Sequence, residues 1–151
     1  MKDSKVASVQ VGYDGRVHKR YRGPLAQERY DNELRVLRYL EAKGCNFVPK
    51  ILEEHPDELY LVTSNCGAKA NNVGDAKMQS LFDELASYGV EHDDRAARNI
   101  TYSAQIGRFC IIDFEFATIP ETGEGLTLEE ATKHSDALKK EGQAKLRDGK
   151  H

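Results

Sequence analysis

The sequence predicts a mixed α+β fold, in which a small antiparallel sheet with one helix precedes a reduced, mostly helical part that contains a hairpin. Three observations lead to this prediction. Apolar residues recur at near-helical spacing over about residues 25–42. Short apolar runs bounded by turn-forming residues lie on both sides of that segment, as is typical of strands. Two further apolar runs, at 100–103 and 109–112, are joined by a turn and indicate a hairpin.

The first part of the chain contains the elements of the predicted sheet. We expect a strand around Val17, which follows a tight turn with two glycines, and then the helix at 25–42. The apolar stripe of this helix consists of Tyr30, Leu34, Leu37, Tyr39 and Leu40. Two more strands are expected at 47–52 and 58–63, because a turn around Pro56 separates two apolar runs.

The second part begins with a polar stretch at 64–75 that is rich in Asn and Gly. An amphipathic helix is expected at 78–88, with an apolar face formed by Met78, Leu81, Phe82 and Leu85. The hairpin follows at 100–112. Asn99 and Asp113 stand directly before and after it, so strand pairing would carry both side chains to the same end of the hairpin.

The last part of the chain is expected to form a further helix, with few apolar side chains to pack against the rest of the protein. Thr127 and Glu130 have the spacing of a capping box, which indicates where this helix begins. Its strong apolar residues are few, so we expect it to pack weakly or to fray. We expect residues 147–151 to be disordered.

Composition excludes several classes of protein. Charged residues make up 31% of the chain and the net charge is −3, so there is no global reason to expect nucleic acid or an anionic membrane as partner. Cys45, Cys66 and Cys110 lack Cys-x-x-Cys spacing, which indicates neither a disulfide framework nor a zinc site. No signal-peptide core and no membrane-spanning run is evident, so by elimination we expect a cytoplasmic protein with no membrane association.

The most informative motif lies between residues 92 and 114. It reads His-x-Asp, four further residues and Asn, ending at Asn99, and then Asp113 followed by Phe. Phosphoryl transfer from a magnesium nucleotide needs one carboxylate near the attacking hydroxyl, together with an amide oxygen and a second carboxylate that hold Mg²⁺. Asp94, Asn99 and Asp113 could supply these three groups.

This order resembles the catalytic loop and the metal-binding Asp-Phe-Gly motif of the protein-kinase-like superfamily. The resemblance implies a minimal kinase-like fold that uses ATP and Mg²⁺, in which Asn99 and Asp113 bind the metal and Asp94 takes the proton of the acceptor hydroxyl. Lys19, in a Val-x-Lys strand, would orient the phosphates, and Glu33 would point inward from the helix to pair with Lys19.

The resemblance also implies which residues surround the nucleotide. Gly12 and Gly15 would form the loop over the phosphates, and backbone groups around Asn65 and Cys66 would meet the adenine. Within the superfamily, the Val17 strand resembles compact atypical kinases associated with transfer-RNA modification. The Asp113 segment resembles choline-kinase-type phosphotransferases, and the residues before Asn99 echo tyrosine kinases, so only the shared machinery is carried over.

The implied domain covers residues 1–120, with an N-terminal lobe at about 5–64, a C-terminal lobe at about 65–120 and a helical extension at 121–151. Only 34 residues follow Ala117, far fewer than protein kinases use to build a peptide-binding lobe. The acceptor is therefore open: it is a protein or a small molecule, and a partner protein or a second copy would complete the groove.

Three departures from the kinase pattern are evident. Two glycines stand where three are usual, Asp93 replaces the arginine that senses a phosphorylated activation loop, and Glu115 replaces the last glycine of Asp-Phe-Gly. Glu115 would remove backbone freedom and add a carboxylate near the metal. Regulation through a phosphorylated loop is not expected.

Other interpretations of the same residues stay open. Asp94 could be a helix cap or a turn residue, and Lys19 could lie on a solvated edge strand. Glu28 competes with Glu33, which could also be a surface partner of Arg29 or Arg35. The leading hypothesis is an ATP-dependent phosphotransferase. The alternatives are a nucleotide-binding regulatory or scaffold protein without turnover, and a chain in which these residues only form a structural polar network.

Overall fold

The computed structural model describes residues 2, 3 and 7–148, and the side chains of 7–141. This part of the chain contains three α-helices and three antiparallel sheets, which confirms the mixed α+β class. The helices are α1 (Ala26–Ala42), α2 (Asp75–Ser87) and α3 (Leu128–Asp148), with short 3₁₀ turns η1 (Pro56–Glu58) and η2 (Ala97–Asn99). The strands are β1 (Lys2–Asp3), β2 (Ala7–Val11), β3 (Val17–Tyr21), β4 (Ile51–His55), β5 (Tyr60–Thr63), β6 (Ala68–Lys69), β7 (Glu91–His92), β8 (Ile100–Ser103), β9 (Arg108–Ile111), β10 (Ala117–Ile119) and β11 (Glu124–Gly125).

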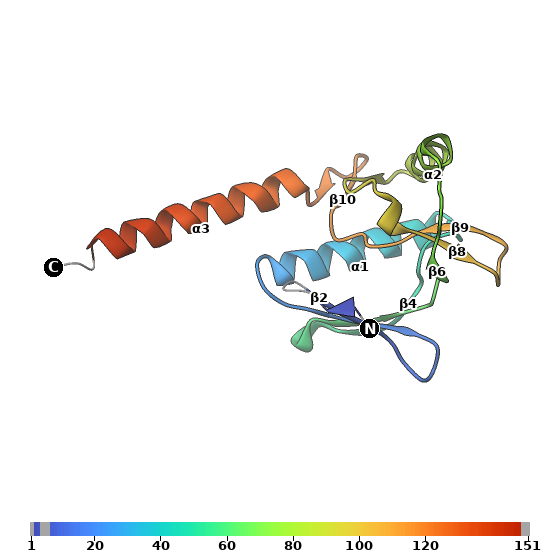
Figure 1. Ribbon diagram of the computed structural model, residues 1–151, viewed down its shortest axis with the longest axis horizontal. Helices are drawn as coiled ribbons and strands as arrows, with labels where there is room; N and C mark the ends of the chain where they lie inside the picture. The colour runs from blue at the N-terminus through green and yellow to red at the C-terminus, as the bar shows by residue number, and fades with distance from the viewer. Residues whose placement is uncertain (1, 4–6, 149–151) are drawn as a thin grey trace.

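The first sheet has the order β1-β2-β3-β5-β4, so β3 lies at its centre. Lys19 of β3 is opposite Val9 of β2 and Leu61 of β5. Because side chains alternate between the two faces of a strand, Lys19 and Tyr21 share one face. Both are buried there, and α1 lies along the sheet on that side (Figure 1).

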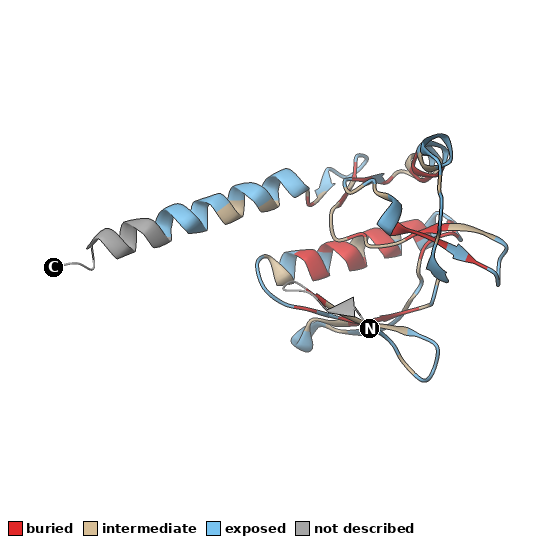
Figure 2. Ribbon diagram, viewed as in Figure 1, coloured by how far each residue is buried: buried red, intermediate tan, exposed pale blue. Residues whose placement is uncertain are grey.

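Helix α1 is buried on more of its surface than an amphipathic surface helix would be (Figure 2). Its apolar stripe is inside, with Tyr30 and Leu40 fully buried and Leu37 2% exposed. Polar side chains on a neighbouring face are buried as well, namely Arg29, Asn32 and Glu33. Burial of a charged side chain is costly without a partner, so α1 requires polar partners from elsewhere in the chain.

Two expected strands begin later than predicted. The segment 47–52 yields strand only from Ile51, since Pro49 has no N–H to donate and Phe47 enters the core, where its carbonyl accepts from Ile111 N–H at 3.0 Å. The segment 58–63 becomes β5 only from Tyr60, because residues 56–58 form η1 instead.

The second part contains short strands that the sequence did not predict. The polar stretch 64–75 includes β6, which pairs with β8, and α2 begins within it, at Asp75 rather than at residue 78. The hairpin of β8 and β9 is present, with Ile100 opposite Ile111. A third sheet, of order β11-β10-β7, joins the end of the 113–119 segment to His92.

Helix α3 projects from the body of the molecule (Figure 1) and is mostly exposed (Figure 2). The predicted capping box is present, since Glu130 N–H donates to Thr127 Oγ1 at 3.1 Å. Asp93 also binds the start of the helix, accepting from Leu128 N–H at 2.7 Å. The helix continues to Asp148, so the expectation of disorder fails for residues 147–148, and 149–151 lie outside the described residues.

None of the helices in the described ranges has both the length and the apolar character that crossing a membrane would require.

A leucine in the core and a leucine on the surface should contribute differently to the stability of the protein. Leu40→Ala, in the core face of α1, should lower the free energy of unfolding by about 2–5 kcal/mol, because it leaves a cavity. Leu138→Ala, at a 49% exposed position of α3, should change it by less than about 0.5 kcal/mol. Urea unfolding of both variants measures this, and equal losses would contradict the fold described here.

Candidate functional site

The site is built around a buried ion pair between the central strand and α1. Lys19 Nζ lies 2.8 Å from Glu33 Oε1, and the two residues are 6% and 4% exposed. Glu28, the alternative to Glu33, is exposed on the same helix. The structure therefore brings Lys19 and Glu33 together in the interior. The alternative, a solvated lysine on an edge strand, is wrong because Lys19 is buried on the central strand.

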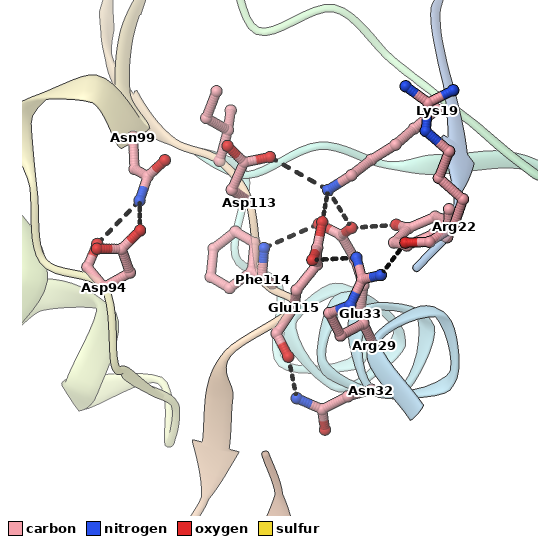
Figure 3. Close-up of polar contacts among 12 residues, drawn as sticks. Lys19, Arg22, Arg29, Asn32, Glu33, Asp94, Asn99, Asp113, Phe114 and Glu115 are labelled. Carbon is pink, nitrogen blue, oxygen red and sulfur yellow. Dashed lines mark hydrogen bonds and ion pairs between the residues drawn. The ribbon is translucent and has the colours of Figure 1, made fainter. Parts of the chain in front are cut away.

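Glu33 is held by three donors. Besides Lys19, the Tyr21 hydroxyl donates to Oε1 and Phe114 N–H donates to Oε2 at 2.8 Å (Figure 3). Burial and the neighbouring charge of Glu33 raise the pKa of Tyr21 well above its usual range, so the hydroxyl keeps the proton that it donates. Both oxygens of Glu33 are thus fixed between β3 and the segment after β9.

Lys19 contacts two further carboxylates, Asp113 Oδ1 at 3.3 Å and Glu115 Oε1 at 2.6 Å. Burial alone would lower the pKa of Lys19, but the charge of Glu33, with those of Asp113 and Glu115, outweighs it and holds the pKa well above its usual range. Lys19 is therefore charged in the folded protein.

Glu115 is held in turn by α1. Arg29 Nη1 lies 3.0 Å from Glu115 Oε2, and Asn32 Nδ2 donates to the backbone oxygens of Glu115 and Ala117 at 2.9 and 3.0 Å. The Glu115 side chain pairs with two buried cations, Lys19 and Arg29, and its expected effect on a metal stays a prediction. The interpretation of Arg29 as a surface residue is wrong, since its side chain is 2% exposed.

The 92–99 segment is braced by His92. His92 Nε2 donates to Ile112 O at 3.1 Å, and Asp94 N–H donates to His92 Nδ1 at 3.0 Å. These two contacts require the neutral ring with its proton on Nε2. Burial lowers the pKa of His92, which favours the same state.

Asp94 is surrounded by two side chains from the turn that follows it. One nitrogen of Arg98, Nη2, lies 2.6 Å and 2.7 Å from the two carboxylate oxygens. Asn99 Nδ2 donates to the backbone and carboxylate oxygens of Asp94 at 2.9 and 3.0 Å (Figure 3). Asp94 is thus tied to Asn99 directly and is no isolated turn residue.

The hairpin brings Asn99 and Asp113 to one end, as strand pairing predicts, and Ile112 N–H donates to Asn99 O at 2.9 Å. Asp113 has a φ of 62°, in the left-handed region that Asp tolerates better than most residues. The chain thereby turns so that the carboxylate of Asp113 contacts Lys19 while the next N–H reaches Glu33.

The side-chain oxygens of Asn99 and Asp113 at this end of the hairpin fit a Mg²⁺ ion that is bound partly by the protein. They are too few to surround a metal ion without other ligands. The amide oxygen of Asn99 faces Asp113, whose side chain is 43% exposed (Figure 3). In the described residues no cluster of three or more His, Cys, Asp or Glu side chains forms a metal site. Mg²⁺ is usually bound by one or two protein oxygens, with phosphate and water completing its octahedron, so two ligands suffice.

A cavity of about 450 Å³ opens beside these residues. Its apolar lining includes Val9, Val11, Val17, Leu61 and Ile112. Glu33 and Asp113 border it, and Asn65 and Cys66 line it where the chain passes from β5 to β6. The volume is in the range of small-molecule sites, and an apolar space with a few polar groups at one side is typical of them.

Neither of the two predicted loop glycines lines this cavity. The turn is as expected, since Gly12 N–H donates to Arg16 O at 2.9 Å and Gly15 has a φ of 78°. Gly12 instead borders a hollow on the opposite face of the sheet, beside His18 and Tyr60. Contact of these glycines with a nucleotide stays a prediction.

No protein-family model matches the sequence, and no curated protein matches it. A solved structure of Rio2 kinase from Chaetomium thermophilum, an ADP/Mg²⁺-phosphoaspartate complex, is similar to it with a TM-score of 0.58 and 18% identity. The chain has a protein-kinase-like fold. The match covers 78% of this chain and 47% of that kinase, so the chain spans about half of its length.

The kinase-like fold also brings the cysteines together, which their sequence spacing did not indicate. The thiol of Cys66 is hydrogen bonded to that of Cys110, and burial raises the pKa of Cys45 to about 11. All three are free thiols. Cys110 pairs across the hairpin with Thr101, whose hydroxyl donates to Cys66 O at 2.6 Å, so strand register accounts for the contact.

The contacts of His92 predict a pH-dependent stability. Because its folded pKa lies below the unfolded value of about 6.5, the unfolded chain binds more protons in slightly acidic solution. Stability should therefore fall as pH drops below about 6.5, by at most about 1.4 kcal/mol per pH unit from this one group. Urea unfolding at several pH values measures the slope.

The slope should shrink in His92→Gln and persist in His134→Gln, which lies on the projecting helix α3. An unchanged slope in His92→Gln would contradict the role of His92 described above.

Proposed function

We propose that the protein is an ATP-dependent phosphotransferase of minimal kinase-like fold, which transfers a phosphoryl group to a hydroxyl of a protein or a small molecule. The observation that carries this proposal is a cavity lined by Glu33 and Asp113, with Lys19 ion-paired to both and Asp94 hydrogen bonded to Asn99 at the same end of the hairpin as Asp113. These residues come from the central strand, α1, the 92–99 segment and the end of the hairpin. Positioning and neutralisation of charge are the main needs of phosphoryl transfer, and this set provides for both.

In this proposal the apolar cavity holds the nucleotide base, with backbone groups around Asn65 and Cys66 at its edge. Lys19 meets the phosphates, and Glu33 fixes the lysine side chain. The ADP and Mg²⁺ of the Rio2 kinase complex support nucleotide use for this kind of fold.

Asn99 and Asp113 would hold Mg²⁺, which supplies positive charge against the phosphate oxygens when bound. Asp94 would accept the proton of the acceptor hydroxyl. Its contact with Asn99 Nδ2 at 3.0 Å would keep that carboxylate next to the metal ligands. Arg98, 57% exposed at its side chain, would be free to leave Asp94 for an anionic acceptor or the transferring phosphate.

A second candidate is a nucleotide-binding regulatory or scaffold protein without turnover. The contact of Arg98 with both oxygens of Asp94 favours it, because a carboxylate engaged twice is a poorer base.

Nucleotide binding is tested by thermal unfolding with and without excess Mg-ATP. Ligand at about a hundred times its dissociation constant adds roughly 2.7 kcal/mol, enough to raise the melting temperature of a domain of this size by several degrees. Asp113→Asn should lose this rise, whereas Asp57→Asn, an exposed substitution in η1, should keep it. The proposal fails if the wild type shows no rise at millimolar Mg-ATP.

Turnover separates the two candidates. The wild type should consume ATP, measured as release of ADP, and Asp94→Asn should lower this rate by about 10²–10⁴-fold while the Mg-ATP melting shift stays. Undiminished turnover in Asp94→Asn would remove Asp94 from the reaction. A wild type that binds Mg-ATP but releases no ADP with any acceptor tried would favour the scaffold.

A further inference from the structure

Helix α3 begins next to the 92–99 segment. The N–H of Leu128, the first residue of α3, donates to Asp93 Oδ2 at 2.7 Å. Just before the helix, Leu126 N–H donates to Ala117 O of β10 at 3.1 Å. The start of α3 is therefore fixed to the third sheet through its backbone, and to the 92–99 segment through the side chain of Asp93.

The helix also has a capping arrangement of its own. Glu130 N–H donates to Thr127 Oγ1 at 3.1 Å, and Thr127 N–H donates to Glu130 Oε2 at 3.3 Å. This capping box satisfies two backbone N–H groups at the helix start from within the helix. Asp93 is exposed, so its carboxylate is not needed to fill the core. The contact of Asp93 adds to the capping box a connection between α3 and another part of the chain.

The connected residue stands directly before Asp94, whose backbone is held on both sides. On the C-terminal side, Asn99 Nδ2 donates to Asp94 O at 2.9 Å. On the N-terminal side, Asp94 N–H donates to His92 Nδ1 at 3.0 Å, and Asp93 N–H donates to Phe116 O at 2.9 Å. Because the N–H and the carboxylate of Asp93 bind two different elements, a rotation of its backbone would break at least one of these contacts.

We infer that Asp93 is a positioning residue, which binds the start of α3 and thereby fixes the backbone that carries the Asp94 carboxylate. This inference rests on the proposed phosphotransferase function, in which Asp94 accepts the proton of the acceptor hydroxyl. A base acts only within hydrogen-bonding reach of that hydroxyl, so a small displacement of Asp94 slows transfer. Nucleotide binding does not involve Asp94 in this scheme and should not depend on Asp93.

Two substitutions remove the contact from opposite sides. Asp93→Ala removes the acceptor. Leu128→Pro removes the donor, since proline has no N–H and is well tolerated at the first position of a helix. Both should lower kcat for ADP release by about ten- to a hundredfold, as expected when a catalytic group is slightly misplaced. Both should leave the KM for Mg-ATP and the Mg-ATP melting shift unchanged.

The double variant, Asp93→Ala with Leu128→Pro, tests whether the two residues act through one contact. Its kcat should equal that of the single variants, because the second substitution removes nothing further. A kcat lowered by the product of the two single effects would mean that the residues act independently, and would overturn the inference.

Each substitution has a matched control. Asp93→Asn keeps a side-chain oxygen that can accept from Leu128 N–H, and Leu128→Ala keeps the N–H itself, so both should retain the kcat of the wild type. Asp136→Ala removes an exposed carboxylate from the middle of α3 and should also have no effect. If Asp93→Asn loses as much kcat as Asp93→Ala, the charge of Asp93 matters rather than its contact with α3, and the inference is wrong.

Amide hydrogen exchange reports on the 92–99 segment without turnover. Exchange there should be faster in Asp93→Ala and in Leu128→Pro than in the wild type, because local opening becomes easier. If Asp93→Ala does not fold, Leu128→Pro and Leu128→Ala carry the test by themselves.

The failure of the inference differs from that of the proposed function. Unchanged kcat or unchanged exchange in the variants, in a wild type that turns over, would overturn the role of Asp93 and leave the phosphotransferase standing. Loss of the Mg-ATP melting shift in the variants would also overturn it, since the contact would then support the fold of the whole site. A wild type that releases no ADP would overturn the proposed function, and the inference with it.

Discussion

The structure depends on the burial of one ammonium group, that of Lys19, between the sheet and α1. Removing a charge from water costs several kcal/mol unless partners surround it, and loss of one partner of a buried pair is strongly destabilising. Glu33 and Glu115 supply those partners here. The position of α1 against the sheet, and the path of the chain after β9, both follow from the need to satisfy this group.

The segment after β9 serves the cluster with consecutive residues. Asp113 contacts Lys19, Phe114 N–H binds Glu33, and Glu115 bridges Lys19 and Arg29. These contacts depend on the left-handed backbone at Asp113. It turns the chain between the contact of Asp113 with Lys19 and that of Phe114 N–H with Glu33. Asn32 then fixes the same segment from the helix through two backbone oxygens. Glycine at position 115 would provide none of the side-chain contacts.

Much of this could be predicted from the sequence where local pattern was enough. The apolar stripe of α1 and the turn of the hairpin predict the main elements. The positions of Asp94, Asn99 and Asp113 in the sequence predict that these residues lie near one end of the hairpin. The chemical roles of these residues remain the proposal. Strands of two or three residues, such as β6 and β7, show no alternation from which to predict them. The partnership of Arg29 with Glu115 joins residues 86 positions apart, and neither residue differs in sequence from an ordinary solvated charge.

These contacts join residues that are far apart in the sequence, and this separation affects the order in which the protein folds. The sheet and α1 end at Thr63, yet Arg29, Asn32 and Glu33 each have a further partner at residues 114–117. A nascent chain that has released only its first half lacks the carboxylate partner of the buried Arg29 and the Phe114 N–H that binds Glu33, so α1 docks less firmly on the sheet at that stage. The packing of α1 on the first sheet is therefore complete only after the segment that follows the hairpin has joined them.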